Sequence, residues 1–155
     1  VRLVGSEMCI RDSTYRGKTA RNAAMFGPPG RLYVYLSYGI HLNGNIVCAP
    51  EGTGQGCLMR GGEIVEGEQL ARSRRQAKDR APIPYENLAR GPGNLGRALG
   101  LSLDDNGAPV QLTMRTEEPE WVTGPRIGIS KNADAPFRFW IPRNKTVSTP
   151  RGYPK

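Results

Sequence analysis

Residues 31–45 read RLYVYLSYGIHLNGN, and their first part alternates between apolar side chains and aromatic or polar ones. Three apolar side chains share one side of an extended strand, and three polar or aromatic ones share the other: Leu32, Val34 and Leu36 against Tyr33, Tyr35 and Ser37. Tyr38 and Gly39 interrupt the alternation, and a second extended stretch follows through Ile46 and Val47. The pattern predicts a β-hairpin with its apolar side toward the core and Tyr38 at its turn.

Glycine and proline punctuate the rest of the chain so closely that we expect short elements. The 155 residues contain 20 glycines and 13 prolines. Acidic residues followed by basic ones predict a helix from Ile64 to about Lys78, and GPG at 91–93 with Gly100 predicts a short one between them. Further strands are expected at 57–60, 110–114, 125–130 and 138–141. Helices inserted among strands predict one mixed domain of the α+β class.

The composition is that of a globular protein with an excess of positive charge. Apolar residues make up 37% of the chain and charged residues 23%. No apolar stretch approaches the roughly 20 residues that cross a bilayer, so no membrane partner is expected. The net charge of +8 favours a polyanionic partner, of which nucleic acid is the commonest. A surface charge that only maintains solubility is the alternative.

Cysteine and histidine are too few to predict a metal centre. Cys9, Cys48 and Cys57 form neither an even disulfide set nor a metal-ligand spacing, and His41 is the single histidine. Reduced thiols are typical of a cytoplasmic or nuclear protein. We therefore expect no metal and no disulfide.

The tyrosines of the hairpin are the first candidates for a binding function. A large aromatic at a hairpin turn has little to pack against, and Tyr38 could wedge between base steps of DNA. Tyr33 and Tyr35 could stack on a base drawn out of the helix. Alternatively, they are ordinary strand formers that cover a second layer of structure.

Other polar residues have two interpretations each. Arg60 ends the apolar stretch CLMR and suits either an anchored phosphate or water contact or a structural salt bridge. Asn45 could read a base edge or cap a bulge. The loop at 91–93 could aim helix amides at a phosphate with Arg97 nearby, or it could place a proline at the helix start with no ligand. The arginines between 72 and 80 have the pattern of a solvated helix face.

Several blocks of sequence, taken in order, resemble the alkyladenine (3-methyladenine, methylpurine) DNA glycosylase family. They are YRGKTARNAAMFGPPGRLYVYLSYGIHLNGNIV, CLMRGGEIVEG, LARGPGNLGRALGL, TGPRIGIS and FRFWI, with KTVS beyond it. Together they span residues 15–148, nearly the whole chain. The resemblance implies a curved antiparallel sheet, short helices and a protruding β-hairpin that enters the DNA minor groove.

The resemblance also implies roles for individual residues. Tyr38 would fill the gap left by a flipped nucleotide, with Gly39 and Arg97 among the DNA contacts. Tyr35 would stack on the extruded base, and Asn45 would oppose the amino group of guanine. Arg60 would lie beside the sugar and the attacking water, whereas His41 is not the base-contacting histidine of the family.

The implied reaction is hydrolysis of the N-glycosidic bond of an alkylated or deaminated purine, which leaves an abasic site. No cofactor is implied. The implied partner is double-stranded DNA that carries a damaged purine, bound by a monomer in the bacterial cytoplasm with its nucleoid, or in a nucleus. Electron-rich tyrosines would favour a cationic methylated base. A non-catalytic basic DNA-binding module is the alternative function.

The first 13 residues depart from the family. Its general base is a glutamate in a motif like VETEAYLG, whereas this chain reads VRLVGSEMCIRDS, with Ser13 about where a pocket histidine belongs. We expect residues 1–13 to be foreign and artefactual, 14–150 to be a glycosylase-like domain without its N-terminal strands, and 151–155 to be a tail. Glu7 is not expected to replace the missing base. The expected consequences are an open sheet edge and an inactive, weakly DNA-binding chain.

Overall fold

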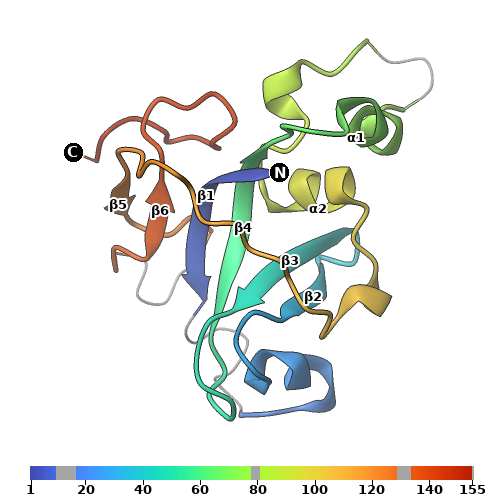
Figure 1. The fold of residues 1–155 in the computed structure, drawn as a ribbon, viewed down its shortest axis with the longest axis vertical. Helices are drawn as coiled ribbons and strands as arrows, with labels where there is room; N and C mark the ends of the chain where they lie inside the picture. Colours follow the sequence, from blue (N-terminus) through green and yellow to red (C-terminus); the bar gives the residue numbers. More distant parts are fainter. Residues whose placement is uncertain (10–16, 78–80, 129–133, 155) are drawn as a thin grey trace.

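The computed structural model describes residues 1–9, 17–77, 81–128 and 134–154 (Figure 1). Runs of strands and runs of short helices follow one another within these ranges, which confirms the predicted α+β class. In chain order the elements are β1 (Arg2–Cys9), the 3₁₀ helix η1 (Ala20–Phe26), β2 (Leu32–Ser37), β3 (His41–Val47), β4 (Gly56–Glu63), α1 (Glu68–Arg75), the 3₁₀ helix η2 (Tyr85–Asn87), α2 (Pro92–Leu99), the 3₁₀ helix η3 (Leu103–Asp105), β5 (Val122–Gly124) and β6 (Arg138–Trp140). None of the described helices is long and apolar enough to cross a membrane.

All six of these strands form one antiparallel sheet in the order β2-β3-β4-β1-β6-β5. β1 lies near its centre and pairs with β4 from Arg2↔Glu63 to Cys9↔Gly56, while β6 pairs with its other side. The prediction that the sheet has an open edge at its N-terminal strands is therefore wrong, because residues 2–9 form a strand between β4 and β6. The expected boundary between residues 13 and 14 lies outside the described residues.

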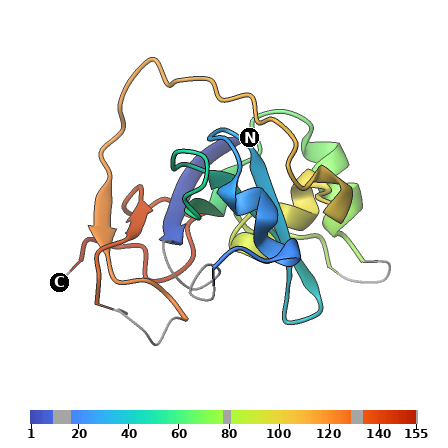
Figure 2. The same cartoon turned by 90° about the horizontal axis from the view of Figure 1, so that it is seen from below.

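The β2–β3 hairpin is present where the alternation predicted it. Tyr38 and Gly39 in the three-residue connection have φ angles of 50° and 72°, both left-handed as at the centre of a type I′ turn, and the Ile40 amide donates to the Ser37 carbonyl at 3.1 Å. Figure 2 shows this turn at the periphery of the ribbon. The outer edge of β2 is covered, since the Leu32 amide donates to the Ala108 carbonyl at 2.8 Å and the Gly107 amide donates to the Leu32 carbonyl at 2.7 Å.

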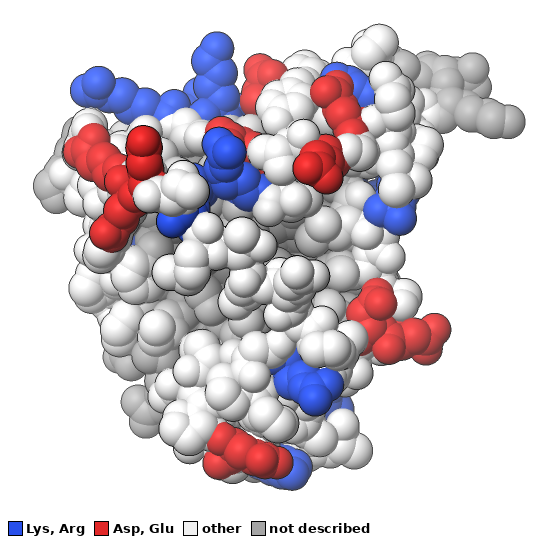
Figure 3. All heavy atoms as spheres, in the orientation of Figure 1, with Lys and Arg blue, Asp and Glu red and all other residues white. Residues whose placement is uncertain are grey.

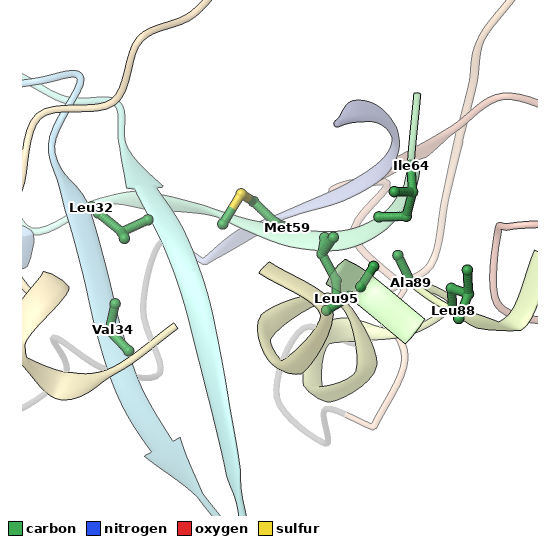
Figure 4. Close-up of a cluster of buried hydrophobic side chains, with 9 residues drawn as sticks. Leu32, Val34, Met59, Ile64, Leu88, Ala89 and Leu95 are labelled. Carbon is green, nitrogen blue, oxygen red and sulfur yellow. The ribbon is translucent and has the colours of Figure 1, made fainter. Parts of the chain in front are cut away.

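One face of the sheet packs against the helices and forms the main core (Figure 4). Leu32 from β2, Met59 from β4 and Leu95 from α2 meet there. α2 approaches β3 so closely that a Cβ on Gly96 would overlap the Leu42 carbonyl oxygen. The opposite face is partly covered by η1, whose Met25 is fully buried in a second cluster.

Two segments differ from the sequence prediction. α1 begins at Glu68 and not at Ile64, because Gly67 adopts a left-handed φ of 73° while Ile64 is buried in the core. No strand forms at 110–114; this exposed segment is part of the long connection that crosses from the β2 edge to β5 in Figure 2. The strand expected at 125–130 also fails at its first residues, since β5 ends at Gly124, and residues 129–130 lie outside the described part.

Candidate functional site

A row of five side chains crosses the face of the sheet opposite the main core. The register pairs Tyr33 with Asn45, Asn45 with Leu58, Leu58 with Glu7, and Glu7 with Arg138. Directly paired residues project from the same face of a sheet. Because neighbouring strands lie about 4.8 Å apart, Glu7 and Asn45 are separated by about 10 Å across β4. The register alone therefore places the Glu7 carboxylate on the same face of the sheet as Asn45 and Tyr33, two candidates for contact with a base.

Glu7 is the acidic member of this row and is only 1% exposed. One of its carboxylate oxygens, Oε2, accepts a hydrogen bond from Arg60 Nη1 at 2.9 Å and a longer one from the Ile127 amide at 3.5 Å. Burial raises the pKa of Glu7, while the charge of Arg60, the Ile127 amide, and then Arg126 and Arg138 each lower it. Desolvation is the largest of these effects, so the carboxyl group binds its proton more tightly than an exposed glutamate.

Arg60 is the partner that fixes this carboxylate. Its side chain is 12% exposed, and it projects from the middle of β4 toward Glu7. The salt-bridge interpretation of Arg60 is thus the one that the described contacts display, and a contact with phosphate or water stays a prediction.

The sequence prediction considered Glu7 as a substitute for the missing base and rejected it, because its neighbours in the chain do not resemble the family motif. The sequence holds only a weak indication that Glu7 lies in a strand. It is the one acidic residue in an eight-residue stretch, 2–9, that contains no proline. Such a stretch can form a strand, and a lone acid within a strand needs a cation. Only the three-dimensional contact, Arg60 Nη1 to Glu7 Oε2 at 2.9 Å, shows that the cation is Arg60.

Tyr33 and Tyr35 behave differently from one another. Tyr33 is buried and packs with Met25 and Val47, so covering a second layer is its observed role. Tyr35 is half-buried, with its ring stacked on that of Tyr33 at a centroid distance of 5.6 Å. Its hydroxyl oxygen accepts a hydrogen bond from Asn43 Nδ2 at 3.2 Å. Tyr35 therefore presents a ring held in place from two sides, as a stacking surface requires.

Asn45 is almost fully buried between these tyrosines and β4. Its Nδ2 donates to the Tyr33 carbonyl at 3.3 Å, whereas its Oδ1 has no hydrogen-bond partner among the described residues. A buried acceptor without a partner costs about 1–3 kcal/mol and calls for an explanation. A base-reading role for Asn45 and a role as the cap of a bulge both stay predictions.

Tyr38 projects from the hairpin turn with 93% of its surface exposed. Ile40 beside it is also exposed. A hollow of about 280 Å³ lies between this turn and the start of α2, lined among others by Tyr38, Asn43 and residues 91–94. The ring thus stands free of the core, as a residue that enters another molecule must.

Arg97 lies apart from the Glu7–Arg60 pair. It lines a second hollow of about 400 Å³ together with His41, Gly93 and Asn94, and its Nε donates to the Arg74 carbonyl at 2.9 Å. Pro92 stands at the first position of α2. The structure therefore brings Arg97 to the hairpin but not to the buried row, and phosphate binding by this helix end stays a prediction.

The arginines of α1 are structural to a greater degree than their pattern suggested. Arg74 donates to the Ala98 and Leu99 carbonyls at 3.1 and 2.8 Å, and Arg75 donates to the Leu88 carbonyl at 2.9 Å. They satisfy carbonyls at the end of α2 and in the segment before it. The prediction of a solvated helix face is thus wrong for Arg74 and Arg75. Lys78 and Arg80 lie outside the described part.

The described residues contain no group of three or more potential metal ligands. Among the cysteines with described side chains, Cys48 and Cys57 are free thiols. On the face shown in Figure 3, lysine and arginine are interspersed with aspartate and glutamate. The net positive charge therefore does not gather into one continuous patch on that face.

Comparison with known proteins shows the family of this chain. A family model described as methylpurine-DNA glycosylase matches residues 12–145. The chain belongs to this family. Glu7 lies outside the matched range, whereas Tyr35, Asn45 and Arg60 lie within it.

Relatives of this glycosylase-family chain occur in several bacteria. A protein of Corynebacterium efficiens is 60% identical over 147 residues, which cover 92% of this chain and 75% of the relative. One from Corynebacterium glutamicum is 62% identical with 92% and 76% coverage, and one from Mycobacterium leprae is 48% identical with 92% and 67% coverage. All three are provisionally named 3-methyladenine DNA glycosylases.

Proposed function

We propose that this chain is a monofunctional DNA glycosylase of base-excision repair, which hydrolyses the N-glycosidic bond of a damaged purine such as 3-methyladenine. The observation that carries the proposal is the buried Glu7–Arg60 pair, which lies in register with Asn45 in a chain of this family. The expected inactivity rested on a missing carboxylate. The position of Glu7 favours an active chain instead.

Glu7 acts as the general base in this mechanism. It accepts a proton from a water molecule whose oxygen attacks C1′ of the damaged nucleotide. The bond from C1′ to the purine nitrogen breaks, and its electron pair leaves with the base. Alkylation places positive charge on the purine, so the base departs as a neutral molecule and needs little further assistance. Arg60 holds the Glu7 carboxylate in place by the 2.9 Å hydrogen bond.

Tyr35 and Asn45 form the base-binding surface. The fixed Tyr35 ring stacks on the flipped purine, and a cationic base gains on the order of 1 kcal/mol or more over such a ring. Asn45, whose Oδ1 atom lacks a partner among the described residues, lies two strands away from Glu7, and the register separates the backbones of the two residues by about 10 Å across β4. This spacing is comparable with the length of a nucleoside.

Tyr38 enters the duplex and occupies the space that the flipped nucleotide leaves. Double-stranded DNA is therefore the partner, with Gly39 at the turn and Arg97 near the backbone. One hairpin serves one lesion, so a monomer suffices, and we expect it to act where bacterial chromosomal DNA lies. The turn holds the Tyr38 ring at the tip of the hairpin, and an exposed aromatic ring at such a tip suits insertion between base steps.

Base release from a duplex that carries one hypoxanthine or one 3-methyladenine tests the proposal. We expect release by the wild-type chain and a rate lower by about 10²- to 10⁴-fold in Glu7→Gln, because the amide cannot accept the proton. Glu51→Gln, in an exposed loop, is the matched control and should keep the wild-type rate.

Three outcomes separate the alternatives. Wild-type release that Glu7→Gln abolishes supports the mechanism. An unchanged rate in Glu7→Gln would remove Glu7 from the role of base. Binding to an abasic-site duplex with no base release would identify a non-catalytic DNA-binding module instead.

A further inference from the structure

Arg138 is a second buried cation beside Glu7, on the side away from Arg60. It lies directly opposite Glu7 in the β1–β6 ladder and is only 2% exposed. Side chains in such a pair have Cβ atoms about 5 Å apart. Arg138 therefore faces the carboxylate from β6 while Arg60 faces it from β4.

The guanidinium group of Arg138 is held by neutral partners. Its Nη2 donates to the Ser148 carbonyl at 2.7 Å, and its Cζ lies 4.5 Å from the centroid of the Trp140 ring. Within the described residues, Arg138 forms no salt bridge of 4 Å or less. A buried cation without a close carboxylate is expensive, so its charge must be balanced over a slightly longer distance.

The surroundings of Arg138 are built to hold it in place. Gly124 pairs with Arg138 from β5 and carries no side chain, and a Cβ there would lie 2.7 Å from Cη2 of Trp140. The missing side chain leaves room for the indole ring, which Trp140 Nε1 anchors by donating to the Gly152 carbonyl at 2.9 Å. The ring in turn supports the guanidinium group, so the cation cannot readily turn away from Glu7.

We propose that Arg138 is a positioning residue for base release, which keeps the Glu7 carboxylate ionised and directed into the row by its charge across the β1–β6 ladder. This inference rests on the proposed function of Glu7 as base. A carboxylate acts as a base only when it is deprotonated, and its burial works against that state.

The groups that face Glu7 come from three further segments. Arg60 faces it from β4, Arg126 from the residues that follow β5, and Arg138 from β6, while Cys57 of β4 pairs with Met8 and projects from the other face. Burial raises the pKa of the Cys57 thiol, so it adds no negative charge near neutral pH. Burial lowers the pKa of Arg138 to about 10, with Arg60 acting in the same direction and Glu7 opposing both, so Arg138 remains charged near neutral pH. Neutralising Arg138 must therefore raise the pKa of Glu7.

The pH dependence of single-turnover base release tests this role. Arg138→Gln keeps a donor for Ser148 and removes the charge, whereas Arg138→Lys keeps the charge. We expect Arg138→Gln to move the acid limb of the rate profile to higher pH, because the variant no longer lowers the pKa of Glu7. On that limb the rate of the variant then lies below the wild-type rate, and at high pH it recovers to the wild-type rate. Arg138→Lys should keep the midpoint.

Arg143→Gln is the matched control for the loss of a cation over an aromatic ring. Arg143 is exposed, lies 5.2 Å from the Tyr153 ring centroid, and is not among the charges that act on Glu7. Arg143→Gln should leave the pH dependence of base release unchanged. A uniform loss of rate at every pH in Arg138→Gln, with the midpoint unmoved, would show a packing role and overturn the inference.

The carboxyl ¹³C shift of Glu7, assigned with the Glu7→Gln variant, provides a readout that needs no activity. It should titrate at higher pH in Arg138→Gln than in the wild type. Absence of base release by the wild type would defeat the proposed function but leave this titration able to support or overturn the coupling. If Arg138→Gln unfolds the protein, the double variant with Glu7→Gln decides the cause. An equal loss of stability with and without the Glu7 carboxylate would show that Arg138 serves packing alone, and would overturn the inference.

Discussion

Replacing Tyr38 by alanine should weaken DNA binding while leaving the stability of the protein almost unchanged. The ring is 93% exposed, so its removal deletes few contacts within the folded chain. Substitutions at such surface positions change the free energy of unfolding by about 0.5 kcal/mol or less. A large effect on binding without an effect on stability is therefore expected only if the ring contacts another molecule.

The size of the binding effect follows from this exposure. A tyrosine buries on the order of 150 Å² or more, and about 25 cal/mol per Å² gives an upper value near 4 kcal/mol for complete burial between base pairs. Unstacking of the base step consumes part of this gain. We expect the variant to lose about 2–3 kcal/mol, which corresponds to a Kd roughly 30- to 150-fold higher.

Fluorescence anisotropy with an abasic-site duplex at fixed salt measures this change, and urea unfolding of the same samples measures stability. Tyr153→Ala is the matched control, because Tyr153 is a partly exposed tyrosine near the C-terminus that has no place in the proposed interface. A wild-type Kd for Tyr38→Ala would refute the insertion of this ring. A loss of binding matched by Tyr153→Ala would show that the effect is not specific to the hairpin.

Three further predictions concern stability. Burial raises the pKa of Glu7 above its ordinary 4.5, so the folded state binds this proton more tightly than the unfolded state. The free energy of unfolding of the wild type relative to Glu7→Gln should therefore fall as pH rises from about 4.5 through the folded-state pKa, with a limiting slope of about 1.4 kcal/mol per pH unit. Urea unfolding at a series of pH values measures this difference, and a rise with pH would contradict the predicted sign. Gly96→Ala should destabilise the protein by several kcal/mol in thermal unfolding, because its Cβ would overlap the Leu42 carbonyl, whereas Gly152→Ala meets open space and should be neutral. Tyr35→Phe should cost about 1 kcal/mol in urea unfolding, because Asn43 loses its acceptor; an unchanged midpoint would show that this hydrogen bond contributes nothing.

Local sequence patterns predicted those parts of the fold that are set by local physics. The alternation at 31–37 and the turn at Tyr38-Gly39 define the hairpin, because side-chain direction in a strand has a period of two and left-handed turns favour glycine. α2 was predictable for the same reason, since Pro92 begins it and Gly100, with a left-handed φ of 73°, ends it. Such signals lie within a few residues of the structure that they specify.

Strands stabilised mainly by distant partners were not predictable in this way. β5 has three residues, too short for a period to be visible, and residues 110–114 carry a strand-like pattern but form no strand in the sheet. β6 was predicted as part of the strand expected at 138–141, but its place beside β1 was not. β1 has a sequence unlike the family motif and is placed by pairing with β4 and β6. The sequence shows no such pairing, because it depends on the register of the whole sheet.

The candidate site divides along the same line. Tyr35, Tyr38, Asn45 and Arg60 were identified through stretches that resemble the family, and the sheet places Tyr35, Asn45 and Arg60 on or beside one row. Their roles toward DNA remain predictions. Glu7 could not be identified in this way, because a one-dimensional motif cannot show that a carboxylate with unfamiliar neighbours is buried against Arg60.

The cations around Glu7 explain why a carboxylate belongs at this position whatever its neighbours in the chain. Arg60, Arg126 and Arg138 converge from three separate segments, and all three lie within residues 12–145, the range matched by the family. Three guanidinium groups that face one buried point would repel one another strongly without an anion between them. The matched part of the chain thus creates the demand for a negative charge at the centre of the sheet. Glu7 meets this demand from outside the matched range, because β1 places its side chain opposite Leu58 and Arg138.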